Sequence, residues 1–202
     1  MLNLAVIYYS AYGTNYQLAK WAEEAGESAG ATVKLLKVRE LAPETVIAND
    51  EAWRTHVEST KDVPIATPDD IAWADAIIFS TPTRYGNMAS QMKQFLDTTG
   101  GIWFQGKTVN KVVSAFASAQ NPHGGQEQTI LSLYTTMYHW GAIVVTPGYT
   151  DSSVFKAGGN PYGTSVSVGD EGKMKEDVQD AVIHQTKRVL QIAQWLKKGM
   201  QA

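Results

Sequence analysis

Five short apolar segments, separated by stretches of helical periodicity, constrain this chain most strongly. The first, Leu2 to Tyr8, is almost continuously apolar, and its length and β-branched content indicate a strand covered on both faces. After it, Leu18, Ala22 and Ala25 recur at the spacing of a helix with one buried face. The other predicted strands are Thr32 to Val38, Asp75 to Thr81, Lys111 to Ser118 and Ala142 to Val145. Further helices are predicted from Met88 to Leu96, from Ile130 to Tyr138 and from Val178 to Leu196.

Strands that alternate with helices at this spacing predict repeated βαβ units and a parallel sheet. Right-handed crossovers then give a doubly wound sandwich of three layers. We expect a single domain over residues 1–202, interrupted around residues 39–70 by an excursion of weak periodicity. The glycine-rich stretch from Thr146 to Asp170 is expected to be a long loop. Ligands of such folds bind at the carboxyl ends of the strands, so the loops after the first, third and fourth strands are the candidates for function.

Charge and cysteine content exclude several functions. The 17 Lys and Arg residues nearly balance the 20 Asp and Glu residues, which argues against a nucleic-acid partner. The absence of cysteine excludes disulfides, thiolate metal sites and cysteine nucleophiles. No apolar run approaches the roughly 20 residues of a membrane span, and the N-terminus has no signal-peptide pattern. We therefore expect a soluble, cytoplasmic protein that uses neither a membrane nor a nucleic acid.

The first candidate loop, Ser10 to Asn15, offers hydroxyls, an amide and a glycine directly before a helix. Backbone N–H groups and the helix dipole attract an anion at such a place. The loop itself contains no lysine or arginine, so a phosphate would be held by amides and hydroxyls. The alternative is an ordinary turn in which Thr14 caps the helix.

The second and third candidate loops suit the two sides of a flat, polar heterocycle. Pro82 to Met88 presents a guanidinium, an aromatic ring and backbone amides, while Ser118 to Gly125 is polar and permits close approach. The alternative for the former is a loop that only caps the next helix.

Other motifs carry less information. Gly101 to Thr108 matches a phosphate-binding GxxxxGK[ST] pattern, but it follows a predicted helix and precedes a predicted strand, so we reject it. His123 and Glu127 are four residues apart without a third ligand, and no metal site is expected. His56 and His184 carry no functional signal. Trp103 is either an aromatic beside a pocket or a core or interface residue.

Taken together, these loops resemble those of the WrbA family of NAD(P)H:quinone oxidoreductases, within the flavodoxin-like superfamily. The segment from Pro82 to Met88 resembles the family signature PTR[FY]GNM. Gly124 to Ile130, followed by His139-Trp140-Gly141, resembles the family's GGQExT helix and its terminal histidine, and Ser10 to Asn15 resembles the phosphate loop. The resemblance covers nearly the whole chain and implies a five-stranded parallel sheet of order 2-1-3-4-5.

The resemblance also implies the residue roles. His139 is assigned both a flavin contact and a catalytic part, at the edge of the ring. Nicotinamide contact is implied at Tyr12 and substrate contact at Trp103. The flavin contacts implied are Ser10, Ala11, Tyr12, Gly13, Thr14, Asn15, Thr83, Arg84, Tyr85, Ser118, Ala119, Gln120, Asn121, Pro122, His123 and His139.

The implied activity is the two-electron reduction of quinones by NADH or NADPH, through FMN, in a ping-pong mechanism. The family is typically tetrameric, and neighbouring subunits complete its flavin pocket. The rival hypothesis is a flavodoxin-type electron carrier that docks on protein partners, although the nearly balanced charge argues against a strongly charged docking face. A protein-binding regulator that holds flavin is a third possibility. The sequence leaves open the choice between NADH and NADPH and the physiological quinone.

Overall fold

The computed structural model describes residues 1–169 and 172–200, which form nine helices and seven strands. The strands are β1 (Asn3–Tyr8), β2 (Thr32–Lys37), β3 (Ala76–Arg84), β4 (Asn87–Met88), β5 (Val112–Ala119), β6 (Ile143–Val144) and β7 (Ser165–Ser167). The helices are α1 (Thr14–Ser28), α2 (Glu44–Ala48), α3 (Glu51–Ser59), α4 (Pro68–Trp73), α5 (Ser90–Asp97), α6 (Gly100–Phe104), α7 (Gln126–His139), α8 (Ser152–Lys156) and α9 (Gln179–Gly199).

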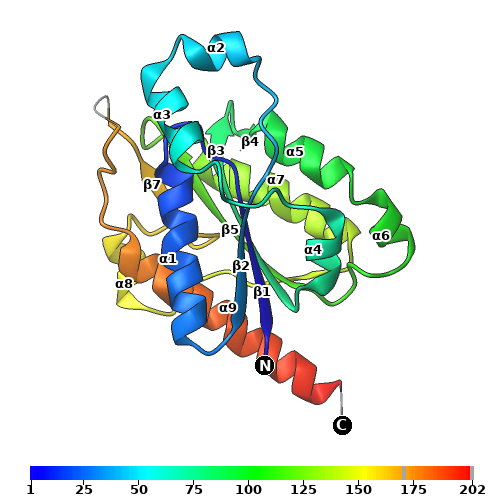
Figure 1. The fold of residues 1–202 in the computed structure, drawn as a ribbon. Helices are drawn as coiled ribbons and strands as arrows, with labels where there is room; N and C mark the ends of the chain where they lie inside the picture. Colours follow the sequence, from blue (N-terminus) through cyan, green and yellow to red (C-terminus); the bar gives the residue numbers. More distant parts are fainter. Residues whose placement is uncertain (170–171, 201–202) are drawn as a thin grey trace.

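The main sheet is parallel and has the order β2-β1-β3-β5-β6. Helices α1 and α9 cover one face, and α5 and α7 cover the other, as Figure 1 shows. Leu4 and Val6 of β1 belong to the core under α1, while Ala5 and Ile7 belong to the core under α7. This alternation explains why the run from Leu2 to Tyr8 is apolar throughout. The predicted α/β architecture with a parallel sheet is confirmed.

The prediction of five strands in the order 2-1-3-4-5 is inexact. In the described residues there are seven, because β4 folds back antiparallel on β3 and β7 pairs in parallel with the end of β5. Both extra strands have at most three residues, too few to leave a periodic signal. Met88 accordingly lies in β4 rather than in the helix predicted from its spacing.

The expected long loop, from Thr146, contains α8 and β7, and its last residue, Asp170, lies outside the described residues. The expected excursion, residues 39–70, contains α2, α3 and the start of α4. In Figure 1, α2 and α3 lie beyond the carboxyl ends of the strands, near the start of α1.

Candidate functional site

The side chain of Asn15, at the start of α1, joins the strands β3 and β5 near the ends that lead into the second and third loops. Its Nδ2 donates to Ser80 Oγ at 3.1 Å, and its Oδ1 accepts from Ser118 Oγ at 2.6 Å. Ser80 Oγ in turn donates to the Asn15 carbonyl at 3.0 Å, and all three residues are buried. The structure therefore gathers the predicted loops at one edge of the sheet. It uses the side chains of Asn15 and Ser118 to hold them there.

A second junction centres on Thr83. Its hydroxyl donates to the Gly124 carbonyl at 3.3 Å and accepts from Thr129 Oγ1 at 2.7 Å and from the Gly86 N–H at 3.2 Å. A Cβ added to Gly125 would lie 2.8 Å from Gly86 Cα, so the two backbones approach closely. The glycines of the GGQExT segment thus permit the third loop to pack directly against the hairpin of β3 and β4.

The tip of that hairpin carries a strained aromatic residue. Tyr85 and Gly86 have φ values of 53° and 77°, and positive φ at both central residues is what a type I′ turn requires. Tyr85 is fully exposed, and the guanidinium of the exposed Arg84 donates to the Thr83 carbonyl at 3.0 Å. Positive φ at a bulky residue is costly and often marks a functional position. The expected loop is therefore a rigid hairpin that presents an aromatic face to solvent.

The first loop has the geometry of an anion site. Gly13 precedes α1 with φ of 95°, and its N–H donates to Ser10 Oγ at 2.9 Å. Thr14 is the first residue of the helix and forms no cap, and in residues 1–169 and 172–200 no hydrogen bond uses its hydroxyl. The capping alternative for Thr14 is therefore wrong. Its hydroxyl and the first amides of α1 are free to meet an anion.

Sequence reasoning missed the part played by the excursion. Tyr12 Oη donates to Asp50 Oδ2 at 2.8 Å, and its ring centroid lies 6.1 Å from that of Trp53. This hydrogen bond to a carboxylate raises the pKa of Tyr12 above its usual value. Asp50 also caps α3 by accepting from the Trp53 N–H at 3.0 Å. The only signal in the sequence is Asp50 as a capping residue, and nothing there indicates that the helix it starts reaches the first loop.

A buried polar network anchors the start of the excursion. Glu40 accepts from Tyr9 Oη at 3.0 Å and from Gln91 Nε2 at 2.7 Å. It also accepts from the backbone N–H groups of Leu41 and Ala42. Burial acts to raise the pKa of Glu40, but these hydrogen bonds outweigh it and hold the pKa below its usual value. The residue before the first loop is thus fixed to both α5 and the excursion.

The remaining third-loop residues, Gln120 to His123, are exposed beside the hairpin. His123 N–H donates to Asn121 Oδ1 at 3.0 Å, and Gln126 Nε2 donates to the Asn121 carbonyl at 2.9 Å. These bonds give the polar loop a defined shape despite its exposure.

Trp103 and His139 lie away from the three loops. Trp103 Nε1 donates to the His139 carbonyl at 2.9 Å, and Thr108 Oγ1 donates to the neighbouring Trp140 carbonyl at 3.0 Å. These residues surround the amino end of β5, whereas the loops lie at its carboxyl end. Eight residues of β5 at about 3.3 Å each separate the two groups by about 25 Å. One chain therefore does not bring Trp103 and His139 to its own loops.

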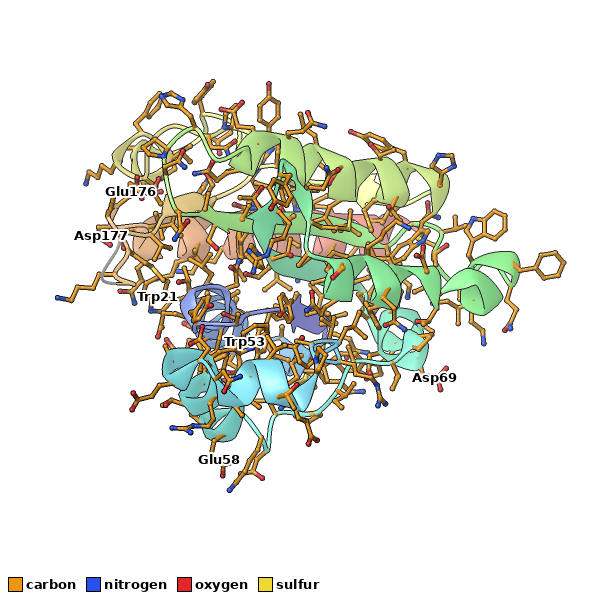
Figure 2. All side chains as sticks on the ribbon, turned by 90° about the horizontal axis from the view of Figure 1, so that it is seen from above. Trp21, Trp53, Glu58, Asp69, Glu176 and Asp177 are labelled. Carbon is orange, nitrogen blue, oxygen red and sulfur yellow. The ribbon has the colours of Figure 1, made fainter. Side chains whose placement is uncertain are left out.

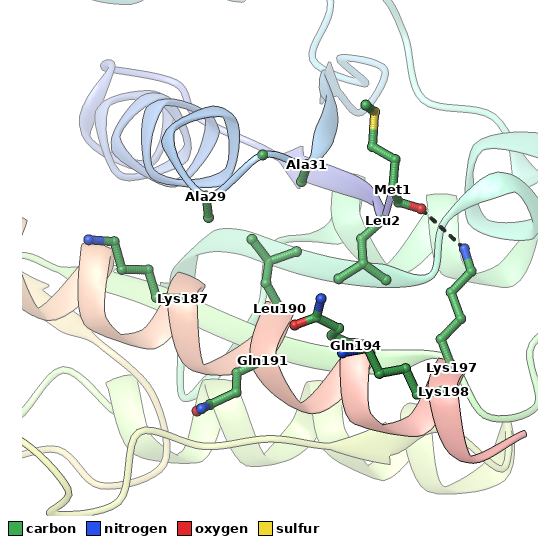
Figure 3. A pocket seen from close by; sticks show the side chains of 11 residues that line it. Met1, Leu2, Ala29, Ala31, Lys187, Leu190, Gln191, Gln194, Lys197 and Lys198 are labelled. Atoms are coloured by element: carbon green, nitrogen blue, oxygen red, sulfur yellow. Dashed lines mark hydrogen bonds between the residues drawn. The ribbon is translucent and has the colours of Figure 1, made fainter. Parts of the chain in front are cut away.

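The structure has two hollows, of which the second borders the third loop at Pro122 and His123. One, of about 450 Å³, lies between α9 and the end of α1, with Leu2, Leu190 and Lys197 among its lining residues (Figure 3). Another, of about 520 Å³, lies between the start of α7 and residues 157–167. Tyr12 of the first loop and Tyr85 of the second are both exposed.

Three negative findings concern the described residues. The rejected GxxxxGK[ST] segment begins in α6 and leads into β5, the reverse of the strand-to-helix context that a phosphate loop needs. Within residues 1–169 and 172–200, no group of three His, Asp or Glu side chains is placed to hold a metal. In the same ranges, no helix has both the length and the apolar character needed to cross a bilayer.

Known proteins resemble this chain over almost its whole length. An NAD(P)H dehydrogenase (quinone) of Deinococcus radiodurans is 51% identical over 191 residues, 95% of either chain. NAD(P)H dehydrogenase (quinone) 3 of Rhizobium meliloti is 46% identical over 85% of this chain and 80% of its own length.

Solved structures show the same fold at low identity. A flavodoxin, WrbA-like protein from Agrobacterium tumefaciens superposes with a TM-score of 0.61 at 23% identity, covering 96% of this chain and 99% of its own. An archaeal flavodoxin has the same TM-score at 15% identity, covering 96% of this chain and 99% of its own. The flavodoxin-like fold is therefore confirmed. It is shared by a protein described as WrbA-like and by a protein described as a flavodoxin.

Residues 3–154 match the family described as NADPH-dependent FMN reductase. That match covers about three quarters of the chain, and it agrees with the relatives and with the loops described above. The chain belongs to this FMN reductase family.

Proposed function

We propose that this protein is an FMN-dependent NAD(P)H:quinone oxidoreductase. The observation that carries the proposal is the meeting of the three loops at one edge of the sheet, held by hydrogen bonds of Asn15 and Thr83, while the Thr14 hydroxyl has no partner among the described residues and Tyr85 is exposed. The long matches to proteins named NAD(P)H dehydrogenase (quinone) support the same activity.

The residues of the three loops fit FMN. The first amides of α1, with Gly13 and the free Thr14 hydroxyl, suit a terminal phosphate. The exposed ring of Tyr85 and the backbone of the hairpin suit a flat heterocycle. We assign the flavin ring to the hairpin residues Thr83 to Tyr85 on one side and to Ser118 through His123 on the other.

FMN, when bound, supplies the redox chemistry by accepting a hydride from the nicotinamide and passing two electrons to a quinone. The protein residues position these molecules in turn, in a ping-pong order. Ser10 and Thr14 hold the phosphate, and Arg84 with the hairpin amides steadies the ring. Tyr12, held by Asp50 at 2.8 Å, forms a wall of the nicotinamide space.

The distance between the loops and the pair Trp103–His139 supports a homotetramer. Because one chain leaves this pair about 25 Å from its own loops, we assign it to the pocket of a neighbouring subunit. There His139 would bond to the flavin edge and carry or stabilise a proton, and Trp103 would cover the quinone. Exposed Phe104, Val109 and Tyr138 around this pair offer apolar surface for the contact. We further propose that the chain works as a single domain in the cytoplasm, since its lack of cysteine suits a reducing compartment.

An electron carrier is the second candidate, because the fold is equally similar to that of an archaeal flavodoxin. Steady-state oxidation of NADH with benzoquinone, using FMN-loaded protein and no reductase partner, separates the two. We expect sustained turnover. A yellow protein without turnover would support the carrier, and a protein that takes up no FMN would remove both candidates.

A further inference from the structure

Tyr12 is an exposed residue of the first loop that the chain nevertheless holds in one position. Its exposed fraction is 56%. Its Oη donates to Asp50 Oδ2 at 2.8 Å, and its ring centroid lies 6.1 Å from that of Trp53 at an interplanar angle of 57°. An exposed side chain without such partners exchanges rapidly among its rotamers. These two contacts hold the hydroxyl end and one side of the ring, and the rest of its surface stays open.

Both contacts come from α3, in the inserted segment. Asp50 is the N-cap residue of α3, and Trp53 belongs to its first turn. In Figure 2, Trp53 lies on the side of α3 that faces the rest of the molecule, whereas Glu58 points outward. No residue of α3 is buried, so this helix contributes little to the hydrophobic core. Its contact with Tyr12 therefore indicates a role at the first loop.

Asp50 uses both of its carboxylate oxygens. Oδ1 accepts from the Trp53 N–H at 3.0 Å, which caps α3, while Oδ2 accepts from the Tyr12 hydroxyl. The Trp53 N–H and then the Tyr12 hydroxyl hold the pKa of Asp50 below its usual value, so the carboxylate is ionised at neutral pH. Hydrogen bonds to an ionised acceptor are stronger than those between neutral groups. One carboxylate thus couples the start of α3 to the ring of Tyr12.

We propose that Asp50 is a positioning residue for the nicotinamide donor and that it acts through Tyr12. It holds the tyrosine ring in the orientation that the nicotinamide contacts, so the inserted segment sets the affinity for the donor. This inference rests on the proposed function, because it assumes that Tyr12 forms a wall of the nicotinamide space. It adds that Asp50 acts on the donor alone, whereas FMN binding and reoxidation by a quinone do not depend on it.

The expected size of the effect follows from the freedom that an unheld side chain has. Immobilising one such side chain when a ligand binds weakens the affinity about twofold to tenfold. Asp50 removes most of this penalty, because Tyr12 is already held before the donor arrives. Loss of the hydrogen bond should therefore weaken donor binding about fivefold, while the rate of hydride transfer from bound donor stays like that of the wild type.

The variants separate positioning from capping. Tyr12→Phe removes the hydroxyl and keeps the ring. Asp50→Ser keeps one oxygen to cap α3 but has no second oxygen for Tyr12. Asp50→Asn is the conservative variant, since its oxygen can cap the helix while its amide donates to Tyr12 Oη. Glu51→Gln is the charge-matched control, because Glu51 is exposed and its side chain has no hydrogen bond within residues 1–169 and 172–200.

Anaerobic stopped-flow absorbance of FMN-loaded protein measures the two half-reactions separately. Flavin bleaching at increasing NADH or NADPH gives the dissociation constant of the donor, and mixing the reduced protein with benzoquinone gives the rate of reoxidation. We expect Tyr12→Phe and Asp50→Ser each to raise the donor dissociation constant about fivefold, and the double variant to raise it no further. The FMN dissociation constant and the reoxidation rate should match the wild type. Asp50→Asn and Glu51→Gln should match it throughout.

A second measurement needs neither flavin nor turnover. The hydrogen bond to Asp50 raises the pKa of Tyr12 above its usual value, and the tyrosine Cζ resonance in ¹³C-labelled, flavin-free protein reports that pKa. Asp50→Ser should return the pKa of Tyr12 toward its usual value, and Glu51→Gln should leave it raised. An unchanged titration of Tyr12 in Asp50→Ser would show that the hydrogen bond does not hold the ring in solution and would overturn the inference.

Three kinetic outcomes would also overturn it. Donor binding that is unchanged in Tyr12→Phe would mean that the hydroxyl has no part in holding the ring. Effects of Tyr12→Phe and Asp50→Ser that multiply in the double variant would mean that Asp50 does not act through Tyr12. Equal losses in donor binding, FMN binding and reoxidation would mean general damage to the site. Each leaves the proposed function intact, whereas a wild type whose flavin neither nicotinamide reduces would remove the proposed function itself.

Discussion

Thr14 and Asn15 are adjacent polar residues with opposite environments. Asn15 is buried and bonded to strands β3 and β5, whereas the Thr14 hydroxyl has no partner among the described residues. Thr14→Val should therefore weaken FMN binding about tenfold but change the free energy of unfolding by less than about 0.5 kcal/mol. Fluorescence titration and urea unfolding measure the two effects. Thr55→Val, at an exposed position of α3, is the control, and equal losses in binding and stability would assign Thr14 a structural role only.

The sequence predicted correctly where polar residues would gather, but not how each would be used. Asn15 and Ser118 were expected at the flavin, and the structure commits their side chains to one another at 2.6 Å. His56 carried no signal, yet it lies over Gly13. These differences arise from contacts between residues far apart in the chain, which no local pattern encodes.

Glu40 illustrates how a half-buried carboxyl should respond to pH. Its pKa is lowered in the folded protein, so its contribution to stability is complete above its unfolded pKa and is lost as the pH falls through the folded pKa. Glu40→Gln, which weakens the bonds to Tyr9 and Gln91, should cost about 1–3 kcal/mol at neutral pH. Urea unfolding across the acid range should show this deficit shrinking as the pH falls through the lowered folded pKa of Glu40, where the wild-type carboxyl also becomes neutral. A deficit that does not depend on pH would mean that packing, not charge, explains the loss.

Among the elements, the hairpin of β3 and β4 depends on its neighbour. Gly125 has φ of 92°, and a Cβ there would press on the Gly86 backbone at 2.8 Å. Gly125→Ala should cost at least about 1–2 kcal/mol from backbone strain alone, and the displaced hairpin should bind FMN more weakly. Thermal unfolding and flavin titration provide the measurements. Gly100→Ala is the matched control, since its Cβ would meet open space at ordinary φ, and a Gly125→Ala protein as stable as this control would contradict the close approach.

Apolar periodicity predicted the longer strands and helices. The runs at β1, β3 and β5 are long and largely buried, the run at β2 is half-buried, and the helices α1, α7 and α9 each show a stripe of apolar residues. The hairpin was missed because its turn places Tyr85, rather than glycine or asparagine, at positive φ. Helix α3 was missed because none of its residues is buried enough to leave an apolar stripe.

At the scale of the whole molecule, the sequence resemblance implied two groups of candidate site residues, the three loops and the pair Trp103–His139. It did not indicate that the length of β5 separates them. This separation follows from the topology, because α7 starts at the carboxyl end of β5 and returns its last residue, His139, to the amino end. An assembly that brings the amino end of one subunit to the carboxyl end of another resolves it. The exposed apolar side chains near Trp103 then become contact surface.

Phe104, 86% exposed at the end of α6, provides the most direct test of that assembly. Phe104→Asp should leave the subunit folded, because this side chain contributes little to its own core, but should place a charge in the contact between subunits. Light scattering after size exclusion should show a tetramer for the wild type and smaller species for the variant. Trp195→Asp, at an exposed position on α9, is the control for adding the same charge elsewhere. In the proposed tetramer, dissociation removes a neighbour's Trp103 and His139 from each flavin pocket. Quinone turnover of the variant should therefore fall more than tenfold on dilution. The far-ultraviolet circular dichroism should stay unchanged, because each subunit remains folded. A Phe104→Asp protein that remains tetrameric and fully active would place the contact surface elsewhere, and a monomeric wild type with full turnover would show that each chain completes its own pocket.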